Sequence, residues 1–222
     1  MENVIHSFFD LEIYAEVFPH LLKGLWTTLW LSIVVIPIGL ISGLLLAVVL
    51  TESKAWPIRW LIIGYIDFFR AFPPLVLLIL VYFGWPFLGV ELDKLTAVVI
   101  AFGLNNASYF AEVFRAGLHG VPGGQMEAAR STGLTRAQAL IYVVIPQATR
   151  NVLPDLVGNS IEIVKLTTIA SVVALPELLR AARDAQALLY NPSPIMLAAM
   201  LYLLLLWPVT RWLGTMEHKR SA

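Results

Sequence analysis

Two sets of polar side chains interrupt long apolar stretches of the chain, and each set spans two helical turns. They are Asn105, Tyr109 and Glu112 in one stretch, and Asp155, Asn159 and Glu162 in the other. Residues spaced i, i+4 and i+7 share one face of a helix. Polar groups at membrane depth face protein or water rather than lipid. The spacing therefore predicts hydrogen-bonding surfaces inside a membrane protein, where a polar solute can be bound.

Other kinds of chemistry lack the residues they need. The sequence contains no Cys, and His6, His20, His119 and His218 have no ligand spacing, so neither thiolate catalysis nor a common metal motif is indicated. No G-x-x-x-x-G-K-[ST] or H-E-x-x-H motif is present, so the sequence offers no P-loop for ATP and no sign of an intramembrane enzyme. The formal net charge is zero, and nothing points to nucleic acid.

Composition places the chain among polytopic membrane proteins. Of its 222 residues, 59% are hydrophobic and 14% are charged, and the mean hydropathy is +0.78. A soluble domain is rarely this apolar. We expect one membrane domain, all-α, over residues 25–215, with an external or interfacial segment at 1–24 and a cytoplasmic tail at 216–222.

Five spans are predicted, at about 25–50, 60–83, 95–114, 149–173 and 194–213. The first is the most secure, because residues 25–50 carry no charge and ~20 apolar residues suffice to cross a bilayer. Gly39, Gly43 and Ala47 place small residues on one face of it, where another helix can pack closely. Pro73-Pro74 must kink or interrupt the second span, because proline donates no backbone hydrogen bond.

Basic residues predict the orientation. With the N-terminus outside, segments 51–70, 115–150 and 211–222 are internal and hold ten Lys and Arg residues, against four in the external segments. Internal loops of membrane proteins are enriched in Lys and Arg. We therefore expect an external N-terminus and a cytoplasmic C-terminus.

A short alanine-rich segment, with a helix at about 125–138, lies between the third and fourth spans on the predicted cytoplasmic side. Glu127 is expected near the start of this helix, where the helix dipole favours a carboxylate. Ala128 and Ala129 form a surface that another protein can approach closely, and Gly133 predicts a turn or break. These features predict a docking helix.

This segment resembles the EAA loop of permease subunits in ATP-binding-cassette importers, which reads E-A-A, three residues, G, nine residues, I-x-L-P. Val143 and Ile145 stand where the motif has Ile and Leu. Phe69 to Leu75 also resembles the F-R-G-T-P-x-L signature of polar amino acid permeases, with Ala71 and Phe72 departing from it. The resemblance extends from Gly24 to Arg220.

The resemblance implies the five-helix fold of type I importer permeases in a bacterial inner membrane. It implies a second permease, identical or homologous, an extracytoplasmic substrate-binding protein, and a cytoplasmic ATPase that carries ATP and Mg, with no cofactor in this chain. The expected coupling residues are Glu127, Ala128, Ala129 and Gly133.

An amino acid substrate carries an ammonium and a carboxylate, which need polar partners at mid-membrane. The residues expected along its path are Asn105, Tyr109, Asn159, Glu162, Lys165 and Thr167. Glu162 would face the ammonium or a cationic side chain of the substrate, and Lys165 the carboxylate, unless the two pair with each other. Leu166 replaces the acidic residue of the family's L-K-D-T-S-L stretch, so no preference for basic amino acids follows.

The alternative function is an oligomeric membrane channel, or a permease for another small polar solute. A channel also uses polar helix faces. It has no need of a docking helix, and co-purification of an ATPase would separate the two functions.

Overall fold

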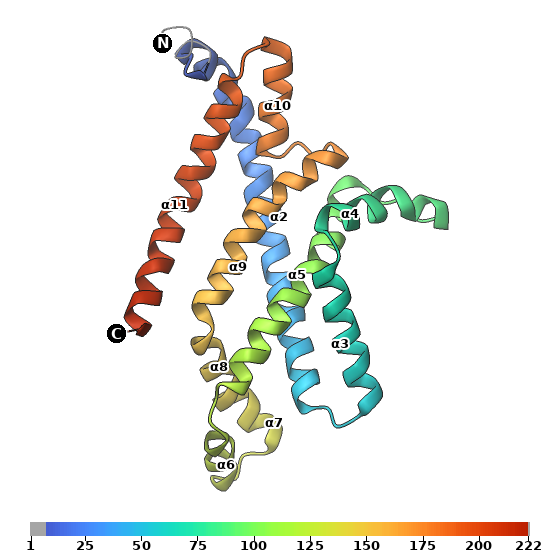
Figure 1. Cartoon of the computed structure of the whole chain (residues 1–222), viewed down its shortest axis with the longest axis vertical. Coiled ribbons are helices and arrows are strands. Elements are labelled where there is room, and N and C mark those ends of the chain that lie inside the picture. Colours follow the sequence, from blue (N-terminus) through green and yellow to red (C-terminus); the bar gives the residue numbers. More distant parts are fainter. Residues whose placement is uncertain (1–7, 222) are drawn as a thin grey trace. The chain divides into compact units, whose positions relative to one another are not determined.

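The computed structural model describes residues 8–221, and the regular elements within this range are all helical (Figure 1). Residues 1–7 of the predicted external segment and residue 222 of the predicted tail lie outside the described part. The elements are α2 (Leu11–Glu52), α3 (Trp56–Ala71), α4 (Pro74–Ile79), η1 (Leu80–Gly84), η2 (Trp85–Leu88), α5 (Lys94–His119), α6 (Gly123–Ser131), α7 (Arg136–Ala139), η3 (Leu140–Val144), α8 (Ile145–Asn151), α9 (Leu153–Leu166), η4 (Thr167–Val173), α10 (Leu178–Leu189) and α11 (Ser193–Ser221).

Four stretches of the described chain are long and apolar enough to cross a membrane. They are Leu11–Glu52, Lys94–His119, Leu153–Val173 and Ser193–Met216. The pair Trp56–Ala71 and Pro74–Leu88 makes a fifth if it is counted as one span. The first helix begins at Leu11, whereas the first predicted span begins at residue 25.

The interruption predicted at Pro73-Pro74 is present. Helix α3 ends at Ala71, and Phe72 is extended, with φ −85° and ψ 126°. The residue before a proline is pushed out of the α region by the proline ring. The position of this break is therefore a local property of the sequence.

The described residues form two compact units. The first comprises the described parts of Met1–Val35, Pro74–Phe102 and Ser160–Ala222, and the second comprises Ile36–Pro73 and Gly103–Asn159. Helices α2, α5 and α9 contribute residues to both units.

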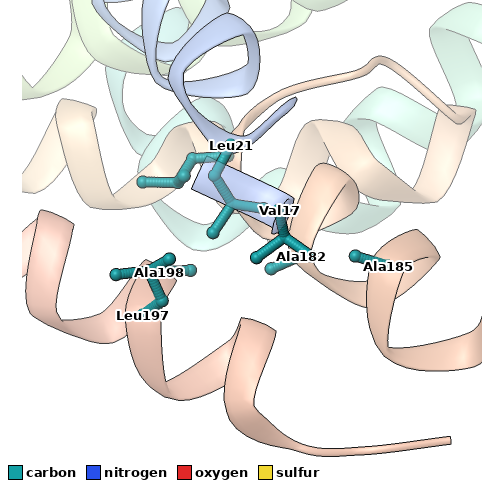
Figure 2. Packing of buried hydrophobic residues seen from close by; sticks show 7 residues of the cluster. Val17, Leu21, Ala182, Ala185, Leu197 and Ala198 are labelled. Atoms are coloured by element: carbon teal, nitrogen blue, oxygen red, sulfur yellow. The ribbon is translucent and has the colours of Figure 1, made fainter. Parts of the chain in front are cut away.

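In the first unit, helix α10 packs against the N-terminal part of α2 and the start of α11. The buried cluster contains Val17 and Leu21 from α2, Ala182 from α10, and Leu197 and Ala198 from α11 (Figure 2). Helix α10 carries small apolar residues on its buried face and charged residues elsewhere, so burial of the apolar face holds it on its neighbours.

In the second unit, α2, α3 and α5 pack together through Leu50, Ile62, Ile66 and Ala111. The predicted small-residue face of α2 is used here. A Cβ added at Gly43 would lie 2.5 Å from Cβ of Phe110 and 2.9 Å from the backbone nitrogen of Ala111. Only glycine allows this approach between the two helices.

Candidate functional site

The alanine-rich segment folds as two short helices in the second unit, α6 and α7. Helix α6 begins at Gly123, so Glu127 lies mid-helix, and the first turn holds no acidic residue. The expected position of Glu127 at the helix start was wrong, because the helix already begins at the Gly123-Gly124 pair. The helix dipole acts only over the first turn and gives no account of this carboxylate.

The break predicted at Gly133 is present. Helix α6 ends at Ser131, and Gly133 follows with φ +94°. This left-handed conformation is the usual end of a helix and suits glycine, which has no Cβ. Helix α7 then begins with a capping box, in which Thr135 and Gln138 each accept a hydrogen bond from the other's backbone N–H. The turn at Gly133 therefore influences the angle between α6 and α7.

One face of α6 is free. Glu127 and Ala128 are exposed. Ala129 is buried against its own unit, so the expectation that it forms the docking surface together with Ala128 was wrong. Among the described residues, no hydrogen bond or ion pair involves the Glu127 side chain. An exposed face with an uncommitted carboxylate beside an alanine can be approached closely by another protein, which the predicted coupling role requires.

Two polar contacts connect this segment to neighbouring helices of its unit. Arg136 donates to both carboxylate oxygens of Glu52, at 2.5 and 3.2 Å. This hydrogen-bonded pairing raises the pKa of the Arg136 guanidinium. Gln147 donates to Gln125 at 3.2 Å. The segment is thus attached to the end of α2 and to α8.

Of the six predicted path residues, Asn105, Tyr109 and Asn159 belong to the second unit. Asn105 is buried and donates to the carbonyl of Phe69 at 2.7 Å. Tyr109 donates to the carbonyl of Arg70 at 3.4 Å. Both side chains therefore bind carbonyls at the end of α3, and Asn159 is half-buried in α9.

The other three, Glu162, Lys165 and Thr167, belong to the first unit. Lys165 donates to Glu162 at 2.7 Å, although both side chains are largely exposed. Thr167 is buried and donates to the carbonyl of Val164. The pairing of Glu162 with Lys165 was one of the two alternatives for these charges, and their role toward a substrate stays a prediction.

The second unit also contains a cleft of about 350 Å³ between α2, α3 and α5. Its charged lining residues are Arg59, Asp67, Arg70, Glu112 and Arg115. Glu112 accepts two hydrogen bonds from Arg115, at 3.0 and 2.6 Å. Its more distant partner is Arg70, whose Nη1 lies 3.9 Å away.

None of the six predicted path residues lines this cleft. The sequence nevertheless held a signal, because Arg59, Ile63, Asp67 and Arg70 follow helical spacing within an otherwise apolar run. A carboxylate inside a predicted span merits attention as a functional residue.

Comparison with known proteins gives the family. Residues 36–221 match the family described as binding-protein-dependent transport system inner membrane component. The chain belongs to this family. It is accordingly a multi-pass inner membrane protein and a non-catalytic permease subunit of an ABC transporter.

Relatives from Bacillus subtilis are similar over most of their length. The permease is 37% identical over 175 residues to the probable amino-acid ABC transporter permease protein YckA, covering 79% of this chain and 77% of the relative. It is 35% identical to the arginine transport system permease protein ArtQ, covering 86% and 88%. It is 32% identical to the probable glutamine ABC transporter permease protein GlnM, covering 95% and 97%.

Solved structures share the fold of the permease. The crystal structure of an amino acid ABC transporter with histidines has a TM-score of 0.82 at 35% identity, covering 92% of this chain and 96% of that one. An inward-facing structure of the MetNI methionine ABC transporter has a TM-score of 0.73 at 21% identity, covering 88% and 94%. The permease therefore has the type I importer fold expected from the sequence.

Proposed function

We propose that this permease forms the membrane path of an ATP-driven amino acid importer and couples it to ATP hydrolysis through α6. The observation that carries this proposal is the exposed, unpaired face of α6 next to the left-handed turn at Gly133. The relatives named for amino acids support the substrate class.

The partners follow from this role. A cytoplasmic ATP-binding subunit, which holds ATP and Mg, receives α6 at Glu127 and Ala128, while the buried Ala129 packs α6 against its own unit. A second permease, identical or homologous, completes the membrane domain, and an extracytoplasmic binding protein delivers the amino acid. The charge distribution of the loops supports an external N-terminus and a cytoplasmic C-terminus.

The path within the permease includes Asn105, Tyr109, Asn159, Glu162, Lys165 and Thr167. Uptake by Glu162→Gln and Lys165→Met permeases tests the two charged members. A changed substrate profile in one variant supports contact with the substrate. Loss in each single variant, with recovery when both charges are reversed, assigns the pair to stability.

Uptake of labelled amino acids tests the function itself. Cells of the source organism lacking this gene are compared with cells that carry it, in a labelled mixture of the twenty L-amino acids. We expect ATP-dependent uptake of at least one amino acid only when the permease is present. Equal uptake by both strains, or uptake that persists after ATP depletion, contradicts the proposal, and the second result favours a channel.

A further inference from the structure

One face of α3 forms a wall of the cleft in the second unit. Arg59, Ile63, Ile66, Asp67 and Arg70 all line the cleft, and their spacing places them on one side of the helix. The face is polar near its two ends and apolar between them. The cleft volume, about 350 Å³, lies at the lower end of the range of about 300–1,000 Å³ typical of small-ligand sites.

The charges in the cleft differ in how fully they are paired. Glu112 is held by the two short hydrogen bonds from Arg115. Arg70 is held only loosely, 3.9 Å from Glu112 and 5.7 Å from the centre of the Tyr109 ring. Among the described residues, no ion pair or hydrogen bond involves the Asp67 carboxylate. A free carboxylate therefore lies one helical turn from a loosely held guanidinium.

A second pair with the same spacing shows that this arrangement is not forced by the helix. Glu162 and Lys165, also three residues apart, contact each other at 2.7 Å. Asp67 and Arg70 have no such contact within the described residues, because Arg70 is directed toward Glu112 and Tyr109. Both Asp67 and Arg70 retain the capacity to bind a further charged group.

Asp67 and Thr51 are two polar residues of the cleft whose side chains have no hydrogen-bond partner among the described residues. Asp67 is exposed on a helix that forms part of a membrane span, and a carboxylate at such a position requires a cation or a water-filled space. The Thr51 hydroxyl, at the same cleft, is buried and has no hydrogen-bond partner within the described part of the chain. Buried polar groups without a partner are rare in proteins and are often satisfied by water or a ligand.

We propose that the cleft is a station for the zwitterionic part of the transported amino acid. Asp67 binds the α-ammonium and Arg70 binds the α-carboxylate, as a carboxylate and a guanidinium commonly do. The half-buried Ile63 faces the amino acid side chain, and the loose contact of Arg70 with Glu112 leaves its guanidinium able to turn toward the carboxylate. This inference rests on the proposed import of amino acids, and adds that the permease itself reads the groups common to all of them.

Equilibrium binding to the purified complex tests the station without the extracytoplasmic binding protein. The detergent-solubilised permease with its co-purified ATPase is titrated with each labelled amino acid that cells import from the mixture. The α-hydroxy acid analogue, which lacks the ammonium, serves as competitor. We expect it to compete at least about tenfold less well than the unlabelled amino acid, since hydrogen bonds to charged groups are stronger than neutral ones.

Variants locate the recognition at Asp67. In Asp67→Asn, the Kd for the amino acid should rise at least about tenfold, and the preference over the α-hydroxy acid should disappear. Asp67→Glu should restore that preference. Glu91→Gln, which neutralises an exposed carboxylate between η2 and α5, should match the wild-type protein in both measurements.

The inference is overturned if Asp67→Asn keeps the wild-type Kd and preference. It is also overturned if the wild-type complex binds no amino acid that its cells import, or binds the α-hydroxy acid equally well. The last two results use the wild-type protein and hold even if Asp67→Asn does not fold. Absence of uptake by the cells contradicts the proposed function instead.

Discussion

Glu127 in α6 and Glu177 before α10 are two carboxylates with opposite surroundings. Glu177 is fully buried and accepts hydrogen bonds from the backbone N–H groups of Leu179 and Arg180 and from Tyr202. Glu127 is exposed, and its side chain has no partner among the described residues. Glu177 fixes a helix within its own chain, whereas Glu127 remains available to another protein.

The helices that carry the two carboxylates also differ in how closely other residues pack against them. At α10, the N–H of Leu178 donates to the buried hydroxyl of Thr28 at 3.2 Å, and Gly24 lies against the helix. At α6, apart from Gly133 and its two chain neighbours, no described residue has an atom within 4 Å of a Cβ added at Gly133. Close packing determines the position of α10, whereas the angle between α6 and α7 depends on the turn at Gly133 in addition to the contacts of Gln125 and Ala129.

The largest effect is expected from Gly133→Leu, which disturbs the turn after α6 and leaves the packing around α10 unchanged. A Cβ at φ +94° is strained even though space is available. The turn should change and α6 should lose its alignment with the ATPase. Amino acid uptake should fall at least about tenfold while the permease remains in the membrane, as measured by uptake and by immunoblot of membranes.

Two further variants separate the effect of the left-handed backbone at Gly133 from the effect of adding a large side chain to a glycine. Gly133→Asn should retain more uptake than Gly133→Leu, because Asn tolerates left-handed backbone better than most residues. Gly89→Leu places the same side chain at another glycine with positive φ, +79°, and open space. If Gly89→Leu reduces uptake as much as Gly133→Leu, the special role of the α6 turn is refuted.

The next largest effect is expected from Gly24→Ala, which disturbs the packing of α2 against α10 and leaves the turn after α6 unchanged. The added Cβ would lie 2.9 Å from Cβ of Ala181 and 3.0 Å from Cα of Leu178, so α10 must move away from α2. Overpacking of this kind costs about 1–3 kcal/mol. Thermal unfolding in detergent should show a lower Tm than for the wild-type protein.

Gly64→Ala is the matched control for this substitution. Gly64 lies in α3, and outside the adjacent turns of that helix no described residue has an atom within 4 Å of an added Cβ. Alanine is the better helix former by about 1 kcal/mol, so Tm should stay unchanged or rise. A lower Tm in both variants would show that close packing at Gly24 is not the cause.

A smaller effect is expected on the pH dependence of protein stability, through the buried carboxyl group of Glu177. Burial raises the pKa of Glu177 above its ordinary value, although the N–H groups of Leu179 and Arg180 lower it in part. The folded protein therefore binds this proton more tightly than the unfolded protein does. Its contribution to stability is present at acidic pH and is lost as pH rises through the raised pKa.

Glu177→Gln replaces the titratable carboxyl group by an amide, which does not ionise. The Tm of the wild-type protein minus that of Glu177→Gln should therefore decrease as pH is raised from the acidic range. Glu91→Gln, with an exposed carboxylate, should keep the wild-type pH profile. A difference between the wild-type protein and Glu177→Gln that is constant with pH would show that Glu177 has no raised pKa.

The smallest effect is expected from the pair formed by the exposed Arg136 and the half-buried Glu52. Surface ion pairs contribute little and are screened by salt. Glu52→Gln should change uptake by about twofold at most, and the change should shrink at high salt. A loss as large as that of Gly133→Leu would show instead that this pair is required for coupling.

Much of the fold could be predicted because the decisive residues act locally. Proline and glycine restrict or widen the backbone choices at their own positions, so the break at Pro73 and the turn at Gly133 are readable from the sequence. Long apolar runs likewise indicate spans without knowledge of their neighbours.

Burial of individual polar groups could not be predicted in this way. Glu177 lies in a connection of mixed charge, and its burial arises only because α2, α10 and α11 meet around it. The uncommitted state of Asp67 depends on the direction that Arg70 takes toward α5. Both depend on contacts between residues distant in sequence, which spacing along one helix does not reveal.

Cysteine crosslinking tests most directly whether α6 is the docking helix. The chain has no native cysteine, so single cysteines can be placed at Ala128 in α6 and at Ala187 in α10, both exposed alanines. The crosslinker is a bifunctional reagent whose maleimide end reacts with the introduced thiol and whose other end reacts with a lysine amine of a neighbouring protein. Ala128→Cys should crosslink to the ATPase and resist a membrane-impermeant maleimide applied to intact cells. Ala187→Cys should be labelled by the impermeant maleimide and give no crosslink to the ATPase. A crosslink to the ATPase from Ala187→Cys and none from Ala128→Cys would contradict the assignment of α6.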